Sequence, residues 1–282
     1  MPDYNSGIVI FGFMQDVKVP RIQVQKTVIT SGYLERDVII DLYAPITILQ
    51  SEPVSLLLIN DGQDLPKFGF DSMLNDLCDD LQPLICAGIH CGKERKMEYG
   101  TASVTDFKGR GARAAKHQKF VFDELLPFIH KRYKIHGFSE KAYAGFSLGG
   151  LSAIDTVWNH PDQFTTAGVF SGSLWWRTRD IGKGYVEETD RIMHKQIREG
   201  SYKPGLRFFF TTGSLDETMD RNNNGVIDSI DDTLALIEEL EKKGYSSGKD
   251  IFYINYSDGR HDVETWGRAM PEFLRWGWGK RR

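Results

Sequence analysis

Hydrophobic and polar positions along the chain follow two periods, and together they predict strands that alternate with helices. Residues 54–60 and 84–90 are nearly continuous apolar runs, as expected of strands that are buried on both faces. Residues 115–133 and 232–243 instead repeat their apolar side chains with the helical period, as a helix with one buried face does. This alternation predicts an α/β fold with a mainly parallel sheet and helices on both faces.

The other expected elements continue the same pattern. An antiparallel pair over residues 24–30 and 37–43 should open the fold, joined by a turn at Ser31 and Gly32. Further strands are expected at 141–144, 166–170, 206–211 and 250–256, and further helices at 71–80, 150–159, 187–198 and 263–276. The 115–133 helix should kink at Pro127, because proline has no amide hydrogen for the helical ladder.

Composition narrows the domain organisation and the range of partners. The chain has 282 residues, of which 40% are hydrophobic and 26% are charged, and this suits one α/β domain with a full core. We therefore expect a single domain over residues 24–282, preceded by an extension over residues 1–23. The net charge of −4 comes from 35 basic and 39 acidic residues without a basic block, so nucleic acid is not an expected partner.

Cysteines and apolar runs exclude several other classes of protein. The three cysteines are odd in number and lack a C-x-x-C pair, so neither a disulfide framework nor a structural zinc is expected. No apolar run approaches the roughly 18 residues that suggest a membrane span. The short apolar stretch 8–11 lacks the flanking residues of a signal peptide. We therefore expect no membrane partner and a cytoplasmic location.

Residues 145–149 read Gly-Phe-Ser-Leu-Gly, a G-x-S-x-G sequence at the expected junction of a strand and a helix. On so sharp a turn the glycines remove Cβ atoms that would collide, and the serine hydroxyl is lifted clear of the sheet. Ser147 is therefore the candidate nucleophile. The alternative is a glycine-rich turn with an incidental serine, and the strand–turn–helix setting argues against it.

The partners of Ser147 are predicted by chain order and by position, since α/β-hydrolases place the acid and then the histidine on loops after later strands. Asp216 follows one such strand and is the candidate acid, while the neighbouring Glu217 stays open as an alternative. His261 follows the next strand and is the candidate base, whose tautomer the carboxylate would fix. The other histidines fail on order or position: His90, His117, His130, His136, His160 and His194.

Two backbone amides are candidates for the oxyanion hole. Leu148 follows Ser147 at the start of a helix, where its N–H can receive developing negative charge. Gln63 lies in the glycine turn after the buried strand at 54–60, which is where a second N–H is required. A simple solvent-exposed turn is the alternative interpretation of Gln63.

Several short motifs occur in an order that resembles a known esterase family. They are Asn60-Asp61-Gly62-Gln63, Arg95-x-x-Glu98-Tyr99, Asp123-Glu124-Leu125-Leu126-Pro127, Gly145-Phe146-Ser147-Leu148-Gly149-Gly150-Leu151, Ser171-Gly172-Ser173-Leu174-Trp175-Trp176 and Gly259-Arg260-His261-Asp262-x-x-x-Trp266. The family includes enterochelin (siderophore) esterases, esterase D-type enzymes, feruloyl and acetyl-xylan esterases, and mycolyltransferases. The resemblance covers residues 24 to 277 and is nearest to the enterochelin-esterase-like branch.

The resemblance implies an α/β-hydrolase fold in which Ser147, Asp216 and His261 form the triad. It also implies a substrate cleft lined by four further side chains, namely Arg95, Tyr99, Trp175 and Trp176. Arg260 departs from the pattern, because many relatives carry a small residue or a histidine before the catalytic histidine. This departure bears on the shape of the pocket.

Residues 220–231 match an EF-hand-type loop. The oxygen donors are Asp220, Asn222, Asn224, the Val226 carbonyl, Asp228 and Asp231, with Gly225 at the sharp turn. The last position holds an aspartate, which reaches less far than the usual glutamate and so weakens calcium or favours magnesium. The alternative is a solvated, asparagine-rich turn that caps the next helix. A structural calcium or magnesium here would stiffen the segment that holds Asp216 without joining the chemistry.

Two functional interpretations follow from the sequence. In the first, the chain hydrolyses a small-molecule carboxylic ester through an acyl-enzyme on Ser147 and needs no cofactor for catalysis; acyl transfer is a variant of this chemistry. In the second, a non-catalytic α/β-hydrolase scaffold binds a sugar or a siderophore. All three residue types of the triad are present in the required order, which favours catalysis.

Overall fold

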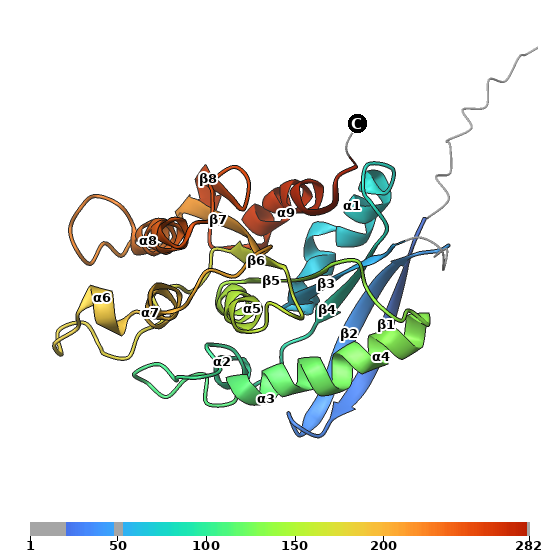
Figure 1. The fold of residues 1–282 in the computed structure, drawn as a ribbon, viewed down its shortest axis with the longest axis horizontal. Coiled ribbons are helices and arrows are strands. Elements are labelled where there is room, and N and C mark those ends of the chain that lie inside the picture. The colour runs from blue at the N-terminus through green and yellow to red at the C-terminus, as the bar shows by residue number, and fades with distance from the viewer. Residues whose placement is uncertain (1–20, 48–52, 281–282) are drawn as a thin grey trace, which may run out of the picture.

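A single mixed sheet forms the centre of the computed structural model, which describes residues 21–47 and 53–280 (Figure 1). Eight strands lie in the order β1-β2-β4-β3-β5-β6-β7-β8. Their bounds are β1 Ile22–Ser31, β2 Arg36–Pro45, β3 Ser55–Asn60, β4 Leu84–Ile89, β5 Lys141–Phe146, β6 Thr166–Phe170, β7 Arg207–Leu215 and β8 Ile251–Arg260. The β1–β2 and β2–β4 pairs are antiparallel and the later pairs are parallel, so the predicted sheet is confirmed.

Helices cover both faces of this sheet (Figure 1). Leu57 and Ile59 of β3 pack with α1 and α9 on one face, whereas Leu56 and Leu58 belong to the core under α4 and α5 on the other. The helical bounds are η1 Gly62–Phe68, α1 Phe70–Leu77, α2 Arg95–Glu98, α3 Ala114–Lys119, η2 Phe120–Leu125, α4 Leu126–Tyr133, α5 Leu148–Asn159, α6 Glu187–Asp190, α7 Ile192–Glu199, α8 Asp228–Lys243 and α9 Val263–Trp278. Of the extension expected over residues 1–23, residues 1–20 lie outside the described residues.

The helix expected over residues 115–133 is present, but its irregularity precedes Pro127. After α3 the path widens into the π-helical η2, where the Leu126 amide bonds to the Val121 carbonyl. Pro127 then lies in the first turn of α4, where its missing amide hydrogen does not interrupt the ladder. The helix expected over 187–198 is likewise divided, because Arg191 adopts an extended conformation between α6 and α7.

Two strands near the carboxyl end are longer than their apolar runs, so the ends expected at residues 211 and 256 are wrong. Pairing between β7 and β8 continues past the hydrophobic residues and across an irregularity after Gly213, until Leu215 lies beside Arg260. Asp216 and His261 therefore follow directly after the ends of two neighbouring parallel strands.

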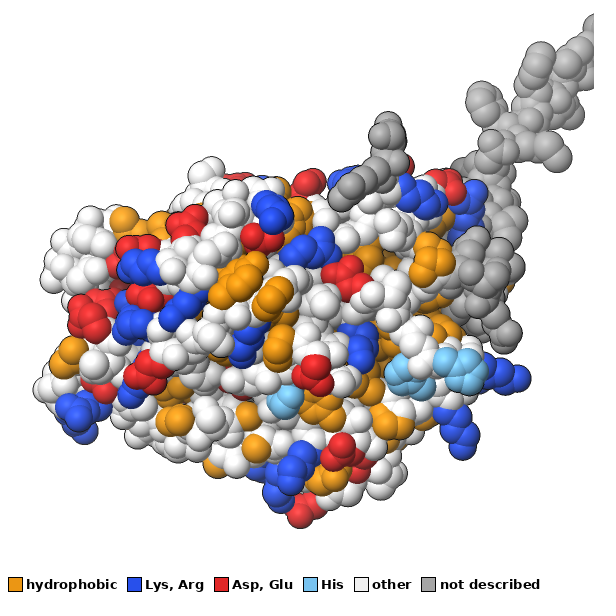
Figure 2. Space-filling model, viewed as in Figure 1, with side chains coloured by type: hydrophobic (Ala, Val, Ile, Leu, Met, Phe, Trp, Pro, Cys, Tyr) orange, Lys and Arg blue, Asp and Glu red, His pale blue; other side chains and the backbone are white. Residues whose placement is uncertain are grey.

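The molecular surface carries both signs of charge. On the face shown in Figure 2, basic and acidic side chains are interspersed, and neither forms an extended patch among the residues drawn in colour. Within the described parts of the chain, no helix is both long enough and apolar enough to cross a membrane.

Candidate active site

Ser147 occupies a sharp turn between β5 and α5. Its backbone has a φ of 55° and a ψ of −120°, a conformation that residues with a side chain rarely adopt. The strand and the helix meet without side chains between them, since a Cβ on Gly145 would lie 2.5 Å from the carbonyl carbon of Gly149. The predicted strand–turn–helix setting is therefore present at this serine.

The Ser147 hydroxyl is held from the end of the neighbouring strand β6. Ser173 Oγ lies 3.2 Å from Ser147 Oγ. The Ser173 amide also donates to the Ser147 carbonyl at 3.1 Å, and the Ser173 side chain is buried. These two contacts fix the turn and orient the serine hydroxyl.

Asp216 and His261 lie together at the carboxyl edge of the sheet. His261 Nδ1 is 4.0 Å from Asp216 Oδ1, which is longer than a hydrogen bond. The other carboxylate oxygen, Oδ2, accepts the Gly213 amide at 3.0 Å. Oδ1 has no hydrogen-bond partner among the described residues, so a small rotation of either side chain would bring His261 into hydrogen-bonding distance.

Burial shifts the pKa values of both groups in the direction that favours the neutral form of each. It raises the pKa of the Asp216 carboxyl, and the hydrogen bond from the Gly213 amide and the influence of the Ser171 hydroxyl oppose that rise. Burial also lowers the pKa of His261 below its usual 6.5; the Asp216 charge opposes this shift and Arg95 adds to it. A neutral imidazole beside a buried carboxyl group is the arrangement that a general base requires.

One cavity of about 340 Å³ contains these groups. It is lined by Arg95, Lys96, Arg110, Ser147, Leu148, Ser171, Gly172, Ser173, Trp175, Asp216, Glu217, Ser229 and His261. The structure thus brings Ser147, Asp216 and His261 to one space, together with Leu148. Glu217, the alternative acid, lines the same cavity.

Two of the four side chains expected to line the cleft do so. Arg95 and Trp175 face the cavity, whereas Tyr99 and Trp176 are fully buried and do not line it. The Tyr99 hydroxyl instead accepts the Asp61 amide at 3.2 Å. A motif identifies an aromatic residue without showing whether its ring faces the core or the cleft, and here packing places two of them in the core.

Arg95 is bound to the turn that follows β3. Its Nε and one terminal nitrogen donate to the two carboxylate oxygens of Asp61, each at 2.7 Å. The same terminal nitrogen lies 3.3 Å from the carbonyl of Phe146, the residue before the candidate nucleophile. Arg95 therefore connects the β3 turn to the β5 turn.

A stacked guanidinium covers the indole that borders the cavity. Arg110 lies 4.8 Å from the ring centre of Trp175 and 5.4 Å from that of Trp176. Asp106 holds Arg110 in place by accepting its Nε at 2.6 Å. This wall is therefore a cation stacked on an aromatic ring rather than a bare aromatic surface.

Six residues of the cavity wall were not among the predicted site residues: Lys96, Arg110, Ser171, Gly172, Ser173 and Ser229. Ser171 and Ser173 follow closely after β6, the parallel neighbour of the strand that leads to Ser147. Active-site groups gather at the carboxyl ends of such strands, so this rule could have found both serines. Lys96 lies in the short helix α2, which no pattern in the sequence predicted.

Gln63, the candidate for the second oxyanion amide, lies in the first turn of η1. This turn is tight, because a Cβ on Gly62 would lie 2.3 Å from the Gly88 carbonyl carbon. The Gln63 side chain accepts the Cys91 amide at 3.1 Å. Amides in the first turn of a helix have no acceptor within that helix, and this holds for Gln63 and for Leu148. Of these two residues, Leu148 lines the cavity.

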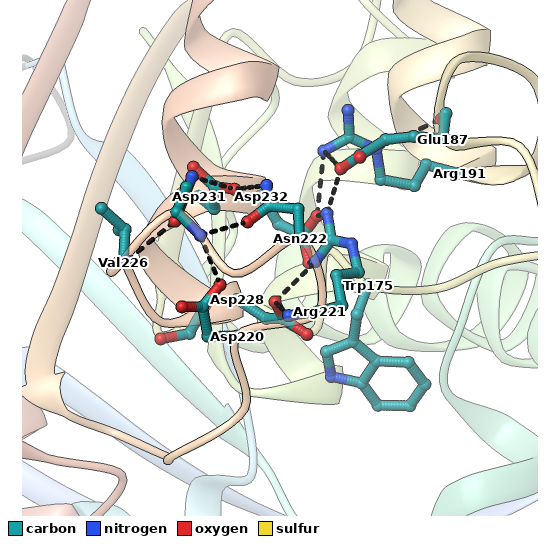
Figure 3. Close-up of polar contacts among 12 residues, drawn as sticks. Trp175, Glu187, Arg191, Asp220, Arg221, Asn222, Val226, Asp228, Asp231 and Asp232 are labelled. Carbon is teal, nitrogen blue, oxygen red and sulfur yellow. Dashed lines mark hydrogen bonds and ion pairs between the residues drawn. The ribbon is translucent and has the colours of Figure 1, made fainter. Parts of the chain in front are cut away.

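The EF-hand-type loop follows β7 and continues into the first turn of α8 (Figure 3). Asp220 accepts the amides of Asn224 and Gly225 at 3.1 and 2.9 Å, so the backbone curls around this carboxylate. The side-chain amides of Asn222 and Asn224 both donate to Asp231, at 2.7 and 3.1 Å. Four of the six expected ligand residues therefore converge.

The other two expected ligand residues are bound differently. Asp228 is the first residue of α8, which starts four residues earlier than expected, and its carboxylate accepts the Arg221 amide at 2.9 Å. The Val226 amide donates to Asn224 Oδ1 at 2.8 Å. Among the described residues, no group of three or more His, Cys, Asp or Glu side chains is placed to hold a metal. A cation would require Asn222 and Asn224 to turn their side-chain oxygens inward.

Arg221 ties this loop to two neighbouring helices, α6 and α7 (Figure 3). It forms ion pairs with Glu187 and with Asp232, the latter at 2.6 Å. Arg191 also binds Asp232, at 2.9 Å. The Arg221 and Asp232 side chains are almost fully buried, so the network fixes the loop against α6 and α7.

Comparison with known protein families agrees with this geometry. The family model described as "Putative esterase" matches residues 31–276. The chain belongs to this esterase family. The predicted α/β-hydrolase fold and the family resemblance of the motifs are thereby confirmed.

Individual relatives of this esterase-family chain are distant. The iron(III) salmochelin esterase of Escherichia coli O6:H1 is 24% identical over 156 residues, which cover 54% of this chain and 34% of that protein. The enterochelin esterase of Shigella flexneri superimposes with a TM-score of 0.68 at 20% identity, covering 92% of this chain and 59% of that one. A ferulic acid esterase gives a TM-score of 0.66 at 18% identity, covering 91% and 97%. The chain thus spans only part of the first two relatives, and the structural likeness shows the shared fold.

Proposed function

We propose that this chain is a serine carboxylic-ester hydrolase that forms an acyl-enzyme on Ser147. The observation that carries the proposal is the shared cavity, which Ser147 lines together with Asp216 and His261. A strained backbone at the serine also favours catalysis over a binding scaffold, because binding alone does not require such strain. Membership of the esterase family supports the same chemistry.

His261 is the general base of this proposal. Its Nδ1 faces Asp216 at 4.0 Å, which leaves Nε2 for the proton of the Ser147 hydroxyl. Before attack, that hydroxyl exchanges its contact with Ser173 for one with His261. Ser147 Oγ then bonds to the ester carbonyl carbon, and His261 passes the proton to the departing alkoxide. A water molecule then attacks the acyl-enzyme while His261 takes its proton. His261 returns the proton to Ser147 Oγ, and the carboxylic acid product is released.

Asp216 is proposed as the acid of the triad in preference to Glu217. It has an unpartnered oxygen 4.0 Å from His261, and its charge would stabilise the imidazolium that forms during attack. Burial raises the pKa of Glu217 and the Ser229 amide opposes that rise, whereas no histidine is among the groups that shift the pKa of this carboxyl. Glu217 is therefore proposed to shape the cavity without orienting the base.

The oxyanion of the tetrahedral intermediate is proposed to bind the amides of Leu148 and Gln63. Leu148 is the first residue of α5, so the positive end of the helix dipole lies at this position. Both amides are free of intrahelical acceptors. Donors already in place require no reorganisation when the charge develops, which is why such sites contribute strongly to catalysis.

A cation in the loop of residues 220–231 is a separate proposal. The order of oxygen-bearing residues and the curl of the backbone around Asp220 support it. The ion would be calcium or magnesium, and it would stiffen the segment that follows Asp216. It would take no part in ester cleavage.

Hydrolysis of p-nitrophenyl acetate and butyrate by wild type and by Ser147→Ala tests the proposed function. We expect the variant to lose roughly 10³-fold or more in kcat, as removal of a triad nucleophile does. Ser247→Ala, which removes an exposed hydroxyl that does not line the cavity, is the matched control and should retain the wild-type rate. Indistinguishable rates for wild type and Ser147→Ala would overturn the proposal. Siderophore and ferulic acid esters, suggested by the names of the relatives, form the second substrate panel.

A further inference from the structure

The buried indole of Trp266 contacts His261 itself and the residue that precedes Ser147. Trp266 lies in the first turns of α9, and its side chain is almost fully buried. Its ring stacks on Phe146, the residue before Ser147, with ring centres 5.0 Å apart and planes 13° apart. The same indole meets the His261 ring edge-on, with ring centres 5.3 Å apart.

The indole also reaches the acid through a hydroxyl group. Trp266 Nε1 donates to Ser171 Oγ at 3.1 Å. Because an indole can only donate, Ser171 is the acceptor and keeps its own hydrogen for a second bond. Ser171 and Asp216 line the same cavity, where Asp216 Oδ1 has no hydrogen-bond partner among the described residues, and the Ser171 hydroxyl lowers the pKa of Asp216.

Ser171 carries a side chain at a backbone conformation that favours glycine. Its φ is 45°, in the left-handed region, and its amide donates to the Thr211 carbonyl at 2.8 Å. Glycine adopts such a φ readily, whereas a serine there is strained. The position thus retains a hydroxyl where a residue without a side chain would be relaxed, and that hydroxyl lines the cavity.

We propose that Trp266 and Ser171 are positioning residues that act together on the acid and the base. The indole N–H directs the Ser171 hydroxyl, the Ser171 hydroxyl orients the Asp216 carboxylate, and the indole ring sets the position of the His261 ring. Neither residue exchanges a proton with substrate. This inference rests on the proposed esterase function, since it assumes the triad of Ser147, Asp216 and His261.

Trp266→Phe tests the inference, because phenylalanine keeps an aromatic ring but loses the N–H. The matched control is Trp278→Phe on the same helix. Trp278 is also buried and packs edge-on against Phe273 with ring centres 5.5 Å apart, and its indole N–H has no partner among the described residues. We expect Trp266→Phe to lower kcat for p-nitrophenyl esters about tenfold with little change in KM, as expected for loss of a hydrogen bond that supports a charged group. Trp278→Phe should keep kcat within about twofold.

Ser171→Gly separates positioning from folding. Glycine relieves the positive φ, which offsets the loss of the hydrogen bond from Trp266, so the melting temperature should change little, whereas kcat should fall about as far as in Trp266→Phe. Without this donor the pKa of Asp216 rises, so Asp216 loses its charge at a higher pH and its protonation adds to that of His261, which sets the acid limb; the limb should therefore become steeper. The other groups that interact with Asp216 are the Gly213 amide, His261, Asp262, Glu217 and Tyr253. The double variant Trp266→Phe/Ser171→Gly should be no slower than the slower single variant, because both changes break one chain of contacts.

Two results would overturn the inference. One is an equal loss of kcat in Trp266→Phe and Trp278→Phe; the other is a wild-type kcat and pH profile in Ser171→Gly. If either occurs while Ser147→Ala is inactive, this inference fails and the esterase proposal stands. If Ser147→Ala is as active as wild type, the proposed function itself fails, and the triad that Trp266 and Ser171 would position fails with it.

Discussion

Arg95 holds both carboxylate oxygens of Asp61, through Nε and one terminal nitrogen, each at 2.7 Å. The Asp61 side chain is 2% exposed, whereas that of Arg95 is 28% exposed and borders the cavity. The guanidinium charge is therefore compensated before any substrate arrives. Its first role is to hold the turn that carries Gly62 and Gln63.

Removal of Arg95 should destabilise the fold. Arg95→Ala leaves a buried carboxylate without its partner, which is expected to lower the free energy of unfolding by about 3–5 kcal/mol. Arg95→Lys should lose less, since lysine keeps the charge but not the two-pronged geometry. Urea unfolding measures both changes.

The control for this experiment is the exposed pair of Arg268 and Asp258. Their nitrogen and oxygen atoms are 3.0 Å apart, but both side chains are largely solvent-exposed. Arg268→Ala should therefore shift the midpoint of urea unfolding much less than Arg95→Ala does. Equal losses at Arg95 and Arg268 would contradict the structural role of Arg95.

Asparagine and glutamine substitutions should identify the acid. Asp216→Asn keeps the shape of the side chain but supplies no charge for the imidazolium, and we expect kcat to fall by roughly 10²–10⁴-fold. Glu217→Gln, the neighbouring substitution of the same kind, should change kcat by less than about threefold. Steady-state hydrolysis of a p-nitrophenyl ester measures both. The reverse order of effects would make Glu217 the acid.

The pH dependence of kcat/KM should reflect the lowered pKa of His261. The base acts in its neutral form, and burial lowers its pKa below the usual 6.5, so the acid limb should have its midpoint below pH 6.5. Activity is then retained as the pH falls through 6.5 and is lost only when the imidazole takes up a proton. A midpoint above pH 6.5 in the wild type would show that burial does not control this group.

Asp262 provides a matched test of the same titration. Its negative charge raises the pKa of His261, so Asp262→Asn should move the acid limb to lower pH. Asparagine can still accept the Thr265 amide at the start of α9, as the Asp262 side chain does at 2.9 Å. The helix cap is therefore preserved, and an unchanged limb would show that the two groups do not interact.

Calcium and magnesium titrations test the loop of residues 220–231. If an ion binds, isothermal calorimetry should detect heat, and an ion at 100 times its Kd should stabilise the fold by about 2.7 kcal/mol. Asp220→Ala should abolish both effects, because Asp220 is the centre around which the loop curls. Asp258→Ala, at an exposed aspartate outside the loop, should retain them. No heat and an unchanged melting temperature at millimolar metal would exclude the site.

The parts of the fold that repeat a simple pattern could be predicted from the sequence. All six residues of β3 and all six of β4 are buried, and continuous apolar runs announce such strands. The turn at Ser147 could also be located, because its glycines are required by contacts between adjacent elements. The strand order within the sheet is a property of packing and had no comparable local signal.

The details of the site depend on partners that are distant in sequence. β7 and β8 extend beyond their apolar residues because each strand supplies hydrogen bonds to the other. Local composition therefore predicts the wrong strand ends. Tyr99 and Trp176 became core residues because of what covers them, which a motif does not encode. The positions of Ser171 and Ser173 follow from a parallel neighbour, and only a topological argument could have placed them beside Ser147.

The strained turn at Ser147 opposes the stability of the fold to the proposed catalytic activity. A side chain held at φ 55° and ψ −120° is destabilising by about 1–3 kcal/mol relative to a relaxed residue. Glycine would relieve that strain while removing the hydroxyl. We therefore expect the fold to be more stable with glycine at this position, although the proposed chemistry needs the serine. Selection for thermal endurance alone would drive this position toward inactivity, and only selection for turnover keeps the serine in place.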